Sequence, residues 1–258
     1  MSIIWELRAD KVISALKEGK RLDERAFDQY REIRIAKDVY KNADGSARVV
    51  LGETEVVAGV KFALGEPYPD MQDEGSICIG AELLPLASPA FESGPLSQES
   101  IELARVVDRG IRESKAIDFK KLCIKEGELV YLAFVDLYAI NFDGNLFDAC
   151  SIAALASLLE AKVPKVEENK IVIGEYKGKL SLSRKPMLST FAKIGTNMLL
   201  DPNLAEEKAM QARFSVATTE DDMLAAFQKG LGGSITKQDV DYCIDVALKK
   251  SKEIRKLL

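Results

Sequence analysis

No histidine occurs anywhere in this chain of 258 residues. Histidine supplies the general base of Ser-His and Cys-His nucleophilic pairs, and it is the commonest side chain on transition metals. The chain by itself therefore forms neither kind of nucleophilic pair and no histidine-ligated metal site. Chemistry based on carboxylates, and binding based on arginine or lysine, remain open.

Cysteine is also scarce, and its spacing does not form a metal-binding pattern. The four cysteines lie far apart, at Cys78, Cys123, Cys150 and Cys243, and no C-x-x-C pair occurs. This pattern argues against a zinc site or a disulfide framework and is typical of a reducing compartment. We therefore expect a cytoplasmic protein with neither a metal site nor a cofactor.

Long apolar runs and an excess of positive charge are missing as well. No apolar stretch approaches the length that crosses a bilayer, and the N-terminus lacks the layout of a signal peptide. The net charge of −5 gives no overall signature of a nucleic-acid-binding protein. We expect no membrane contact, and any contact with RNA must come from a local basic patch.

The chain is long enough for one large domain or two small ones, and its content of 47% hydrophobic and 30% charged residues is ordinary for a globular protein. Apolar residues at helical spacing predict helices at 1–20, 97–114, 149–161 and 237–257. Alternating and continuous apolar runs predict strands at 31–37, 47–51, 54–64, 76–86, 121–124, 128–140, 191–200, 214–219 and 223–227. Ser97 and Thr236 are the expected N-caps of two of the helices.

A basic patch does occur on the expected helix 97–114. Arg105, Asp108, Arg109 and Arg112 follow the spacing i, i+3, i+4 and i+7, which places them on one side of the helix. The guanidinium group is a planar fork of donors suited to phosphate oxygens. A solvated helix face is the more common outcome of such a pattern, and an RNA-binding face is the alternative.

An acidic cluster follows the turn that Asp201-Pro202 opens. Glu206 and Glu207 precede an apolar run that begins at Phe214. Paired carboxylates beside a strand can hold a metal ion or act as an acid and a base. Taken alone, these residues favour a solvated acidic turn.

The same stretch, DPNLAEEKAMQARFSVA at 201–217, resembles a segment of the RNase PH-like phosphorolytic exoribonucleases that reads D-L-N-x-E-E-D-x-x-G-E-A-D-M-P-V-A. The matching residues are Asp201, Asn203, Glu206, Ala212, Val216 and Ala217. Arg213 stands where the family has its essential acid. Arginine neither accepts a proton near neutral pH nor ligates a divalent cation. The resemblance therefore implies a catalytic scaffold whose own active centre is silenced.

The stretch 143–149, DGNLFDA, departs from the same family in a second place. Catalytic members read D-G-G-T-R-T-A, and their Gly-Thr-Arg binds the attacking phosphate at a helix N-terminus. Asn145, Leu146 and Phe147 take those three places here. Leucine and phenylalanine donate no side-chain hydrogen bond to phosphate, so the resemblance implies loss of the phosphate pocket as well.

Other matches extend the resemblance over nearly the whole chain from about Gly19. Arg21, Asp23 and Arg25 fit the family's G-x-R-x-D-x-R segment, and a K-G-x-G-G turn precedes the last helix. The family implies an α/β fold with two βαβ-type halves, each a sheet with packed helices. The expected division is an N-terminal helix at 1–20, a first domain at 21–165, a connection at 166–186 and a C-terminal domain at 187–258.

Within this family, the chain is most similar to the non-catalytic subunit of the archaeal exosome, a complex that degrades RNA from the 3′ end with phosphate. The similarity implies a hexameric ring shared with a catalytic paralogue, RNA-binding cap subunits and single-stranded RNA held by Arg105, Arg109 and Arg112. It implies no catalytic residue in this chain. Two alternatives remain: an active phosphorolytic 3′–5′ exoribonuclease, and a ring subunit of a eukaryotic exosome.

Overall fold

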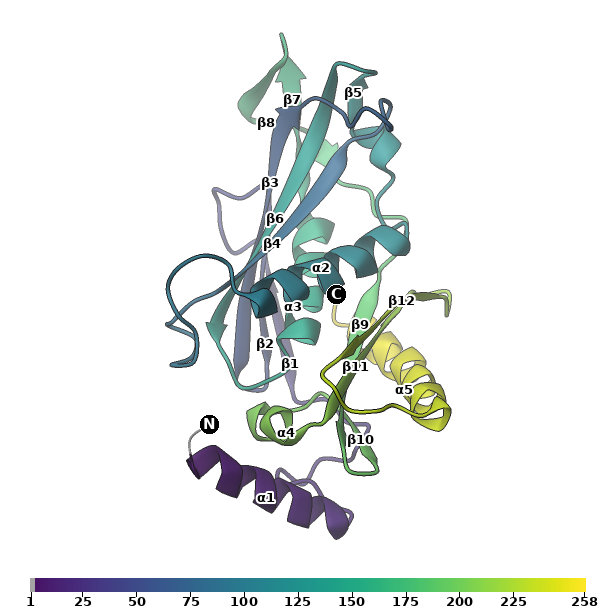
Figure 1. Cartoon of the computed structure of the whole chain (residues 1–258). Coiled ribbons are helices and arrows are strands. Elements are labelled where there is room, and N and C mark those ends of the chain that lie inside the picture. Colours follow the sequence, from purple (N-terminus) through teal and green to yellow (C-terminus); the bar gives the residue numbers. More distant parts are fainter. Residues whose placement is uncertain (1–2) are drawn as a thin grey trace.

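The computed structural model describes residues 3–258, with side chains described from Leu7 onward. Met1 and Ser2 of the expected helix 1–20 lie outside the described residues. The helix found there is α1 (Ile3–Lys17), which ends before a turn at 18–19. Two larger β-sheets with helices between and outside them form the body of the molecule (Figure 1). The expected α/β class, with a sheet and packed helices in each half, is confirmed.

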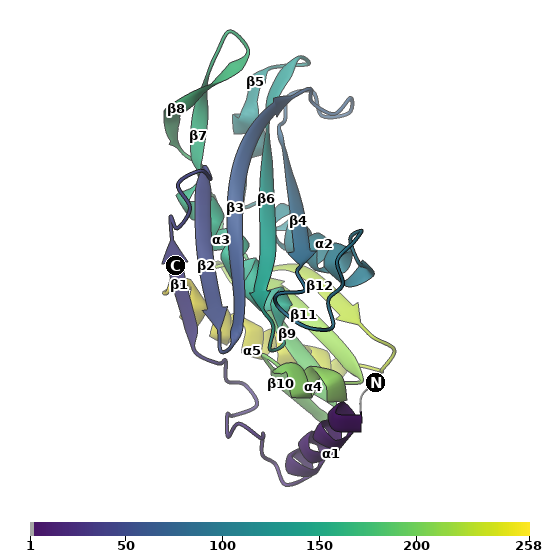
Figure 2. The same ribbon diagram turned by 90° about the vertical axis from the view of Figure 1, so that its left-hand side faces the viewer.

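The first sheet has the strand order β1–β2–β3–β6–β4, and the short β5 pairs with β6. Its strands are β1 (Ile33–Lys37), β2 (Gly45–Leu51), β3 (Thr54–Gly65), β4 (Ser76–Leu83), β5 (Cys123–Lys125) and β6 (Leu129–Asn141). β4 runs parallel to β6, and the crossover between them contains α2 (Gln98–Glu113). Figure 2 shows this sheet face-on, with α3 behind it.

Helix α3 (Leu146–Glu160) lies between the two sheets, because it packs against β2 and β3 on one side and against β9 on the other. Its residues are apolar around the whole circumference, which is typical of a helix buried on most sides. The helix begins three residues before the expected position 149. Asn145 is the N-cap, and its side chain accepts a hydrogen bond from the backbone N–H of Asp148.

The second sheet has the strand order β10–β9–β11–β12, and all of its pairs are antiparallel. Its strands are β9 (Met187–Ile194), β10 (Asn197–Leu200), β11 (Ala212–Thr218) and β12 (Leu224–Gly230). The single strand expected at 191–200 is wrong, because Gly195 adopts a φ of 61° and turns the chain between β9 and β10. Helix α5 (Lys237–Arg255) packs against β9 and β11.

Two smaller elements complete the chain. The hairpin of β7 (Lys162–Glu167) and β8 (Lys170–Lys179) projects from the end of the first sheet in both views (Figures 1 and 2). The short α4 (Leu204–Ala209) follows β10 and packs against α1.

Candidate functional site

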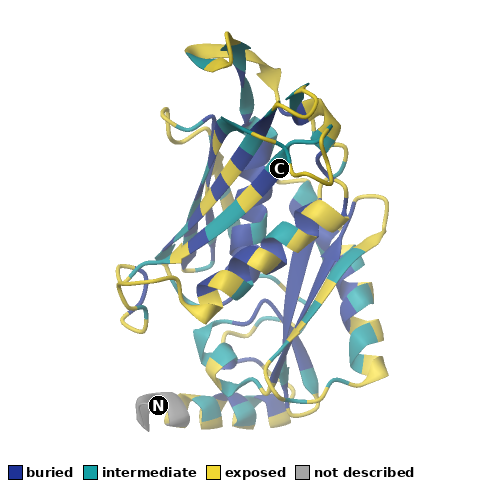
Figure 3. Ribbon diagram, turned by 45° about the horizontal axis from the view of Figure 1, so that its top comes forward, coloured by how far each residue is buried: buried dark blue, intermediate teal, exposed yellow. Residues whose placement is uncertain are grey.

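Helix α2 has one buried and one exposed side (Figure 3), and the arginines are at exposed positions. Its buried apolar residues are Leu103, Ala104, Val106, Val107 and Ile111. Ser97 is the N-cap, as expected, and accepts a hydrogen bond from the backbone N–H of Ser100. The hydrophobic side therefore fixes the rotation of the helix, and this rotation turns Arg105, Arg109 and Arg112 outward.

The three arginines line a shallow hollow of about 330 Å³ between α2 and the edge strand β4. Within the described residues, Arg105 makes no hydrogen bond or ion pair. Arg109 Nη1 donates to Gln228 Oε1 at 3.1 Å. The structure thus brings the three side chains to one concave surface, which we call the arginine face.

Arg112 is the most constrained member of the arginine face. Its Nε and Nη2 donate to the two carboxylate oxygens of Asp108 at 3.1 and 2.9 Å, and Nη2 also donates to the carbonyl oxygen of Ile77 at 3.0 Å. The hydrogen bonds with Asp108 raise the pKa of Arg112 above its usual value. Asp108 therefore orients Arg112.

Arg213 lies in β11 at the position where the family's essential acid is expected. Its side chain is almost wholly buried, and Nη2 donates to Glu102 Oε1 at 2.5 Å. The guanidinium carbon lies 3.9 Å from the centroid of the Phe147 ring, a cation–π contact. The two replacements read from the sequence, at 147 and at 213, therefore pack directly on each other.

The N-terminus of α3 is occupied by a carboxylate of the chain itself. The backbone N–H of Asn145 donates to Glu207 Oε1 at 2.7 Å. Free N–H groups at a helix N-terminus favour an anion, and Glu207 supplies that anion here. Burial raises the pKa of Glu207 from 4.5 to about 7, against the lowering effect of this hydrogen bond and of Arg213.

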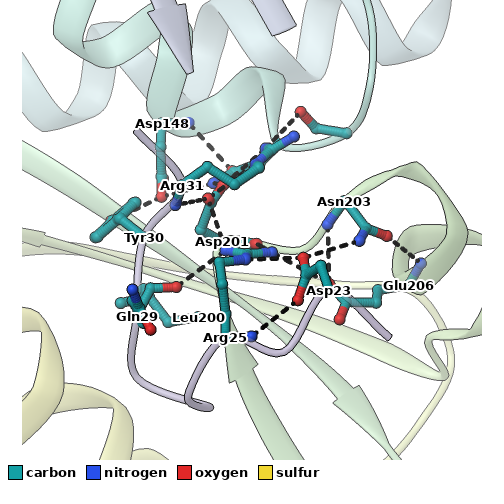
Figure 4. A network of polar contacts seen from close by, with 12 residues as sticks. Asp23, Arg25, Gln29, Tyr30, Arg31, Asp148, Leu200, Asp201, Asn203 and Glu206 are labelled. Atoms are coloured by element: carbon teal, nitrogen blue, oxygen red, sulfur yellow. Dashed lines mark hydrogen bonds and ion pairs between the residues drawn. The ribbon is translucent and has the colours of Figure 1, made fainter. Parts of the chain in front are cut away.

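Arginines of the N-terminal segment form an ionic network with acidic residues of the second half, and Figure 4 shows Arg25 and Arg31 beside Asp201. Arg21 is 3% exposed and donates to both carboxylate oxygens of Glu206, at 2.8 and 2.6 Å. Arg31 donates to both oxygens of Asp201, at 2.9 and 2.8 Å, and Arg25 adds a third contact at 3.1 Å. These residues hold the fold together rather than face a ligand.

The network also corrects the expectation of a solvated acidic turn. Asn203 and Glu206 form a capping box at the start of α4, and Glu206 is 2% exposed. Burial alone would raise the pKa of Asp201, but the hydrogen bonds from Arg31 outweigh it and lower that pKa. The spacing of Asn203 and Glu206 is a recognised signal for a helix start and could have predicted α4.

Asp148, one turn into α3, is a second buried carboxyl beside this network. It accepts hydrogen bonds from Tyr30 Oη at 2.8 Å, from Asn145 Nδ2 at 2.9 Å and from the backbone N–H of Thr190 at 3.0 Å. Its Oδ1 atom is buried without a partner. Burial raises the pKa of Asp148 from 3.8 to about 6.

Two further observations concern other kinds of site. Among the side chains that the structure describes, from Leu7 onward, no three cysteine or acidic groups come together in a way that could hold a metal ion. Each helix in the part of the chain that the structure describes is too short or too polar to span a bilayer.

Comparison with known proteins gives consistent matches over the whole chain. Models of the 3′ exoribonuclease family match residues 29–164 as domain 1 and residues 186–250 as domain 2. The exosome complex component Rrp42 of Thermococcus gammatolerans is 47% identical over 263 residues, which cover 100% of this chain and 96% of that protein. The same component of Pyrococcus horikoshii is 46% identical, and the match covers 99% of this chain and 95% of that protein.

A solved structure agrees in fold and in sequence. A chain of the Archaeoglobus fulgidus exosome with RNA bound to the active site is 43% identical and has a TM-score of 0.94. The match covers 99% of this chain and 99% of that chain. These matches extend over both sheets and over the segments that carry Arg105, Asn145 and Arg213. The chain therefore belongs to the 3′ exoribonuclease family, the RNase PH family, and contains both domains of that family.

Proposed function

We propose that this chain is a non-catalytic ring subunit of an archaeal-type exosome, which degrades RNA from the 3′ end with phosphate. The proposal rests on full-length similarity to archaeal Rrp42 proteins and to a subunit of an RNA-bound exosome. In this proposal the chain alternates with a catalytic paralogue in a hexameric cytoplasmic ring that also carries RNA-binding cap subunits.

Catalytic silence is supported by one observation above the others, the packing of Arg213 on Phe147. A cation lies where the family has an acid, and an aromatic ring lies where the family has a phosphate-binding arginine. The backbone N–H of Asn145 already donates to Glu207 Oε1, so this donor is not vacant for a phosphate.

The arginine face gives the subunit its second role in this proposal. Arg105, Arg109 and Arg112 bind phosphates of single-stranded RNA and hold it for the paralogue's active site. The support is their shared exposure along one hollow in a chain that is otherwise acidic. Such contacts carry no sequence information, because every nucleotide has the same phosphate.

Phosphorolysis by the purified chain tests the silent centre. Single-stranded RNA and inorganic phosphate are supplied to this chain alone, to the catalytic paralogue alone and to the ring assembled from both. We expect nucleoside diphosphates from the ring and none from this chain alone. Release of nucleoside diphosphates by the chain alone, in a preparation free of the paralogue, would show that it is an active exoribonuclease.

A further inference from the structure

A chain of polar side chains connects the silenced centre to the arginine face. Arg213 Nη2 donates to Glu102 Oε1 at 2.5 Å, and Gln228 Nε2 donates to the same oxygen at 3.3 Å. On its other side, Gln228 Oε1 accepts from Arg109 Nη1 at 3.1 Å. The sequence gives no sign of this connection, since Arg109 and Gln228 lie 119 residues apart.

The chemistry of the four side chains fixes the direction of each hydrogen bond. A carboxylate only accepts, so Glu102 requires the NH₂ group of the Gln228 amide to point toward it. A guanidinium only donates, so Arg109 requires the amide oxygen. The amide of Gln228 therefore has one orientation that satisfies both neighbours, and Glu102 determines that orientation.

The four residues also join the two halves of the molecule. Glu102 and Arg109 lie two turns apart on α2, whereas Arg213 and Gln228 lie on the paired strands β11 and β12. Helix α2 runs beside β12 in Figure 1, and the two elements are in contact. The link therefore ties one arginine of α2 to the second sheet.

The positive charge of Arg213 is essential to this arrangement. Glu102 is about one-third exposed, and Arg213 is its ion-pair partner. An aspartate at 213, as the family has, would offer Glu102 no donor and would add a second negative charge in its vicinity. Charge reversal at 213 thus removes a catalytic acid and at the same time provides the partner that holds Glu102 in place.

We propose that Arg213, Glu102 and Gln228 are positioning residues that hold Arg109 in place for an RNA phosphate. The inference rests on the proposed RNA-binding role of the arginine face. The inference concerns Arg109 and not Arg112, because Arg112 is held by Asp108 and the carbonyl of Ile77 instead. The residue at position 213, which is a catalytic acid in the family, accordingly serves to position RNA in this chain within the same fold.

The test measures the affinity of single-stranded RNA for the assembled ring, with Gln228→Leu combined in turn with Arg109→Ala and with Arg105→Ala. We expect Gln228→Leu alone to weaken binding by about twofold to fivefold, the range for one exposed charged contact. In the Arg109→Ala background the same change should have no further effect, whereas in the Arg105→Ala background the two losses should multiply. Gln228→Leu should also make the salt dependence shallower by less than Arg109→Ala does.

A second pair of variants addresses the ion pair. Arg213→Lys keeps the positive charge beside Glu102 and should retain most RNA affinity, whereas Glu102→Gln should weaken binding as Gln228→Leu does. Sedimentation and thermal melting of every ring confirm that assembly is intact.

The possible outcomes separate the two proposals. If Arg109→Ala weakens binding but Gln228→Leu and Glu102→Gln do not, the positioning inference is overturned and the arginine face stands. Losses that multiply in the Arg109→Ala background also overturn it. If Arg109→Ala itself leaves affinity and salt dependence unchanged, the RNA role of Arg109 fails, and the positioning inference fails with it.

Discussion

Glu207 shows how a single carboxyl can oppose stability while it fills a site. Burial raises its pKa to about 7, so the native state binds the proton more tightly than the unfolded chain does. Its contribution to the free energy of unfolding is fully present below about pH 4.5 and is lost as the pH rises toward 7. Asp148 acts in the same direction between its usual pKa of 3.8 and about 6.

Asp201 has the opposite sign and acts in a different pH range. Its pKa is lowered, so its stabilising contribution is present above its usual pKa of 3.8 and is lost as the pH falls further. Of these three carboxyl groups, Glu207 and Asp148 therefore change the free energy of unfolding between about pH 4.5 and 7.

We predict that Glu207→Gln stabilises the chain more at about pH 8 than at about pH 5, because the amide keeps the hydrogen bond from Asn145 and carries no charge. At about pH 8 the free energy of unfolding of the variant should exceed that of the unchanged chain by an amount that approaches about 3 kcal/mol, given a pKa raised from 4.5 to about 7. Urea unfolding at the two pH values measures it. Glu126→Gln, the same change at an exposed turn, is the control variant. An effect of Glu207→Gln that is equal at both pH values would contradict the prediction.

Helix α2 combines a buried apolar side and an exposed side with three arginines in one element. Its buried residues pack under the first sheet and against α3, so its orientation does not depend on the arginines. The exposed positions consequently tolerate alanine, a strong helix former. Changes on the arginine face can therefore be interpreted as changes in binding.

We predict that each of Arg105→Ala, Arg109→Ala and Arg112→Ala lowers RNA affinity of the assembled ring equally for poly-A and for mixed-sequence RNA. Removal of one arginine–phosphate interaction should make the salt slope shallower by about one unit, because fewer counterions are released. Binding is measured at two salt concentrations, with Arg34→Ala on β1 as a control for the removal of one exposed charge. Weakening confined to one RNA sequence would indicate base readout, and unchanged binding would leave the face as solvated surface.

Within residues 3–258, both sheets end in strands that have a pairing strand on one side only. β1 and β4 are the end strands of the main strand order in the first sheet, and β10 and β12 are those of the second. Unpaired edge strands can pair with other chains unless they are covered. A ring in which neighbouring subunits cover these edges would resolve that problem.

We predict that this chain, mixed with a catalytic paralogue, sediments as a hexamer-sized species, because the ring covers sheet edges that the single chain leaves open. Analytical ultracentrifugation of each protein alone and of the mixture provides the measurement. Two separate monomer boundaries in the mixture would be incompatible with the proposed ring.

Local patterns in the sequence predicted much of the fold and part of the site. The cap at Ser97, the buried side of α2 and the exposed positions of Arg105, Arg109 and Arg112 follow from helical periodicity, which depends on near neighbours. The expected strand 191–200 and the solvated acidic turn were wrong where local chemistry was misread, at Gly195 and at Asn203 with Glu206.

The sequence by itself determined which side chains stand at the compared positions: Leu146 and Phe147 have no side-chain donor, and Arg213 has no acid, whatever surrounds them. Only the tertiary structure decided how the remaining charges are partnered. Arg21 meets Glu206 across 185 residues, and Arg213 meets Glu102 across 111. Periodicity carries no information about contacts at such separations, since packing of whole elements brings these side chains together and thereby determines which charges are neutralised and which stay exposed.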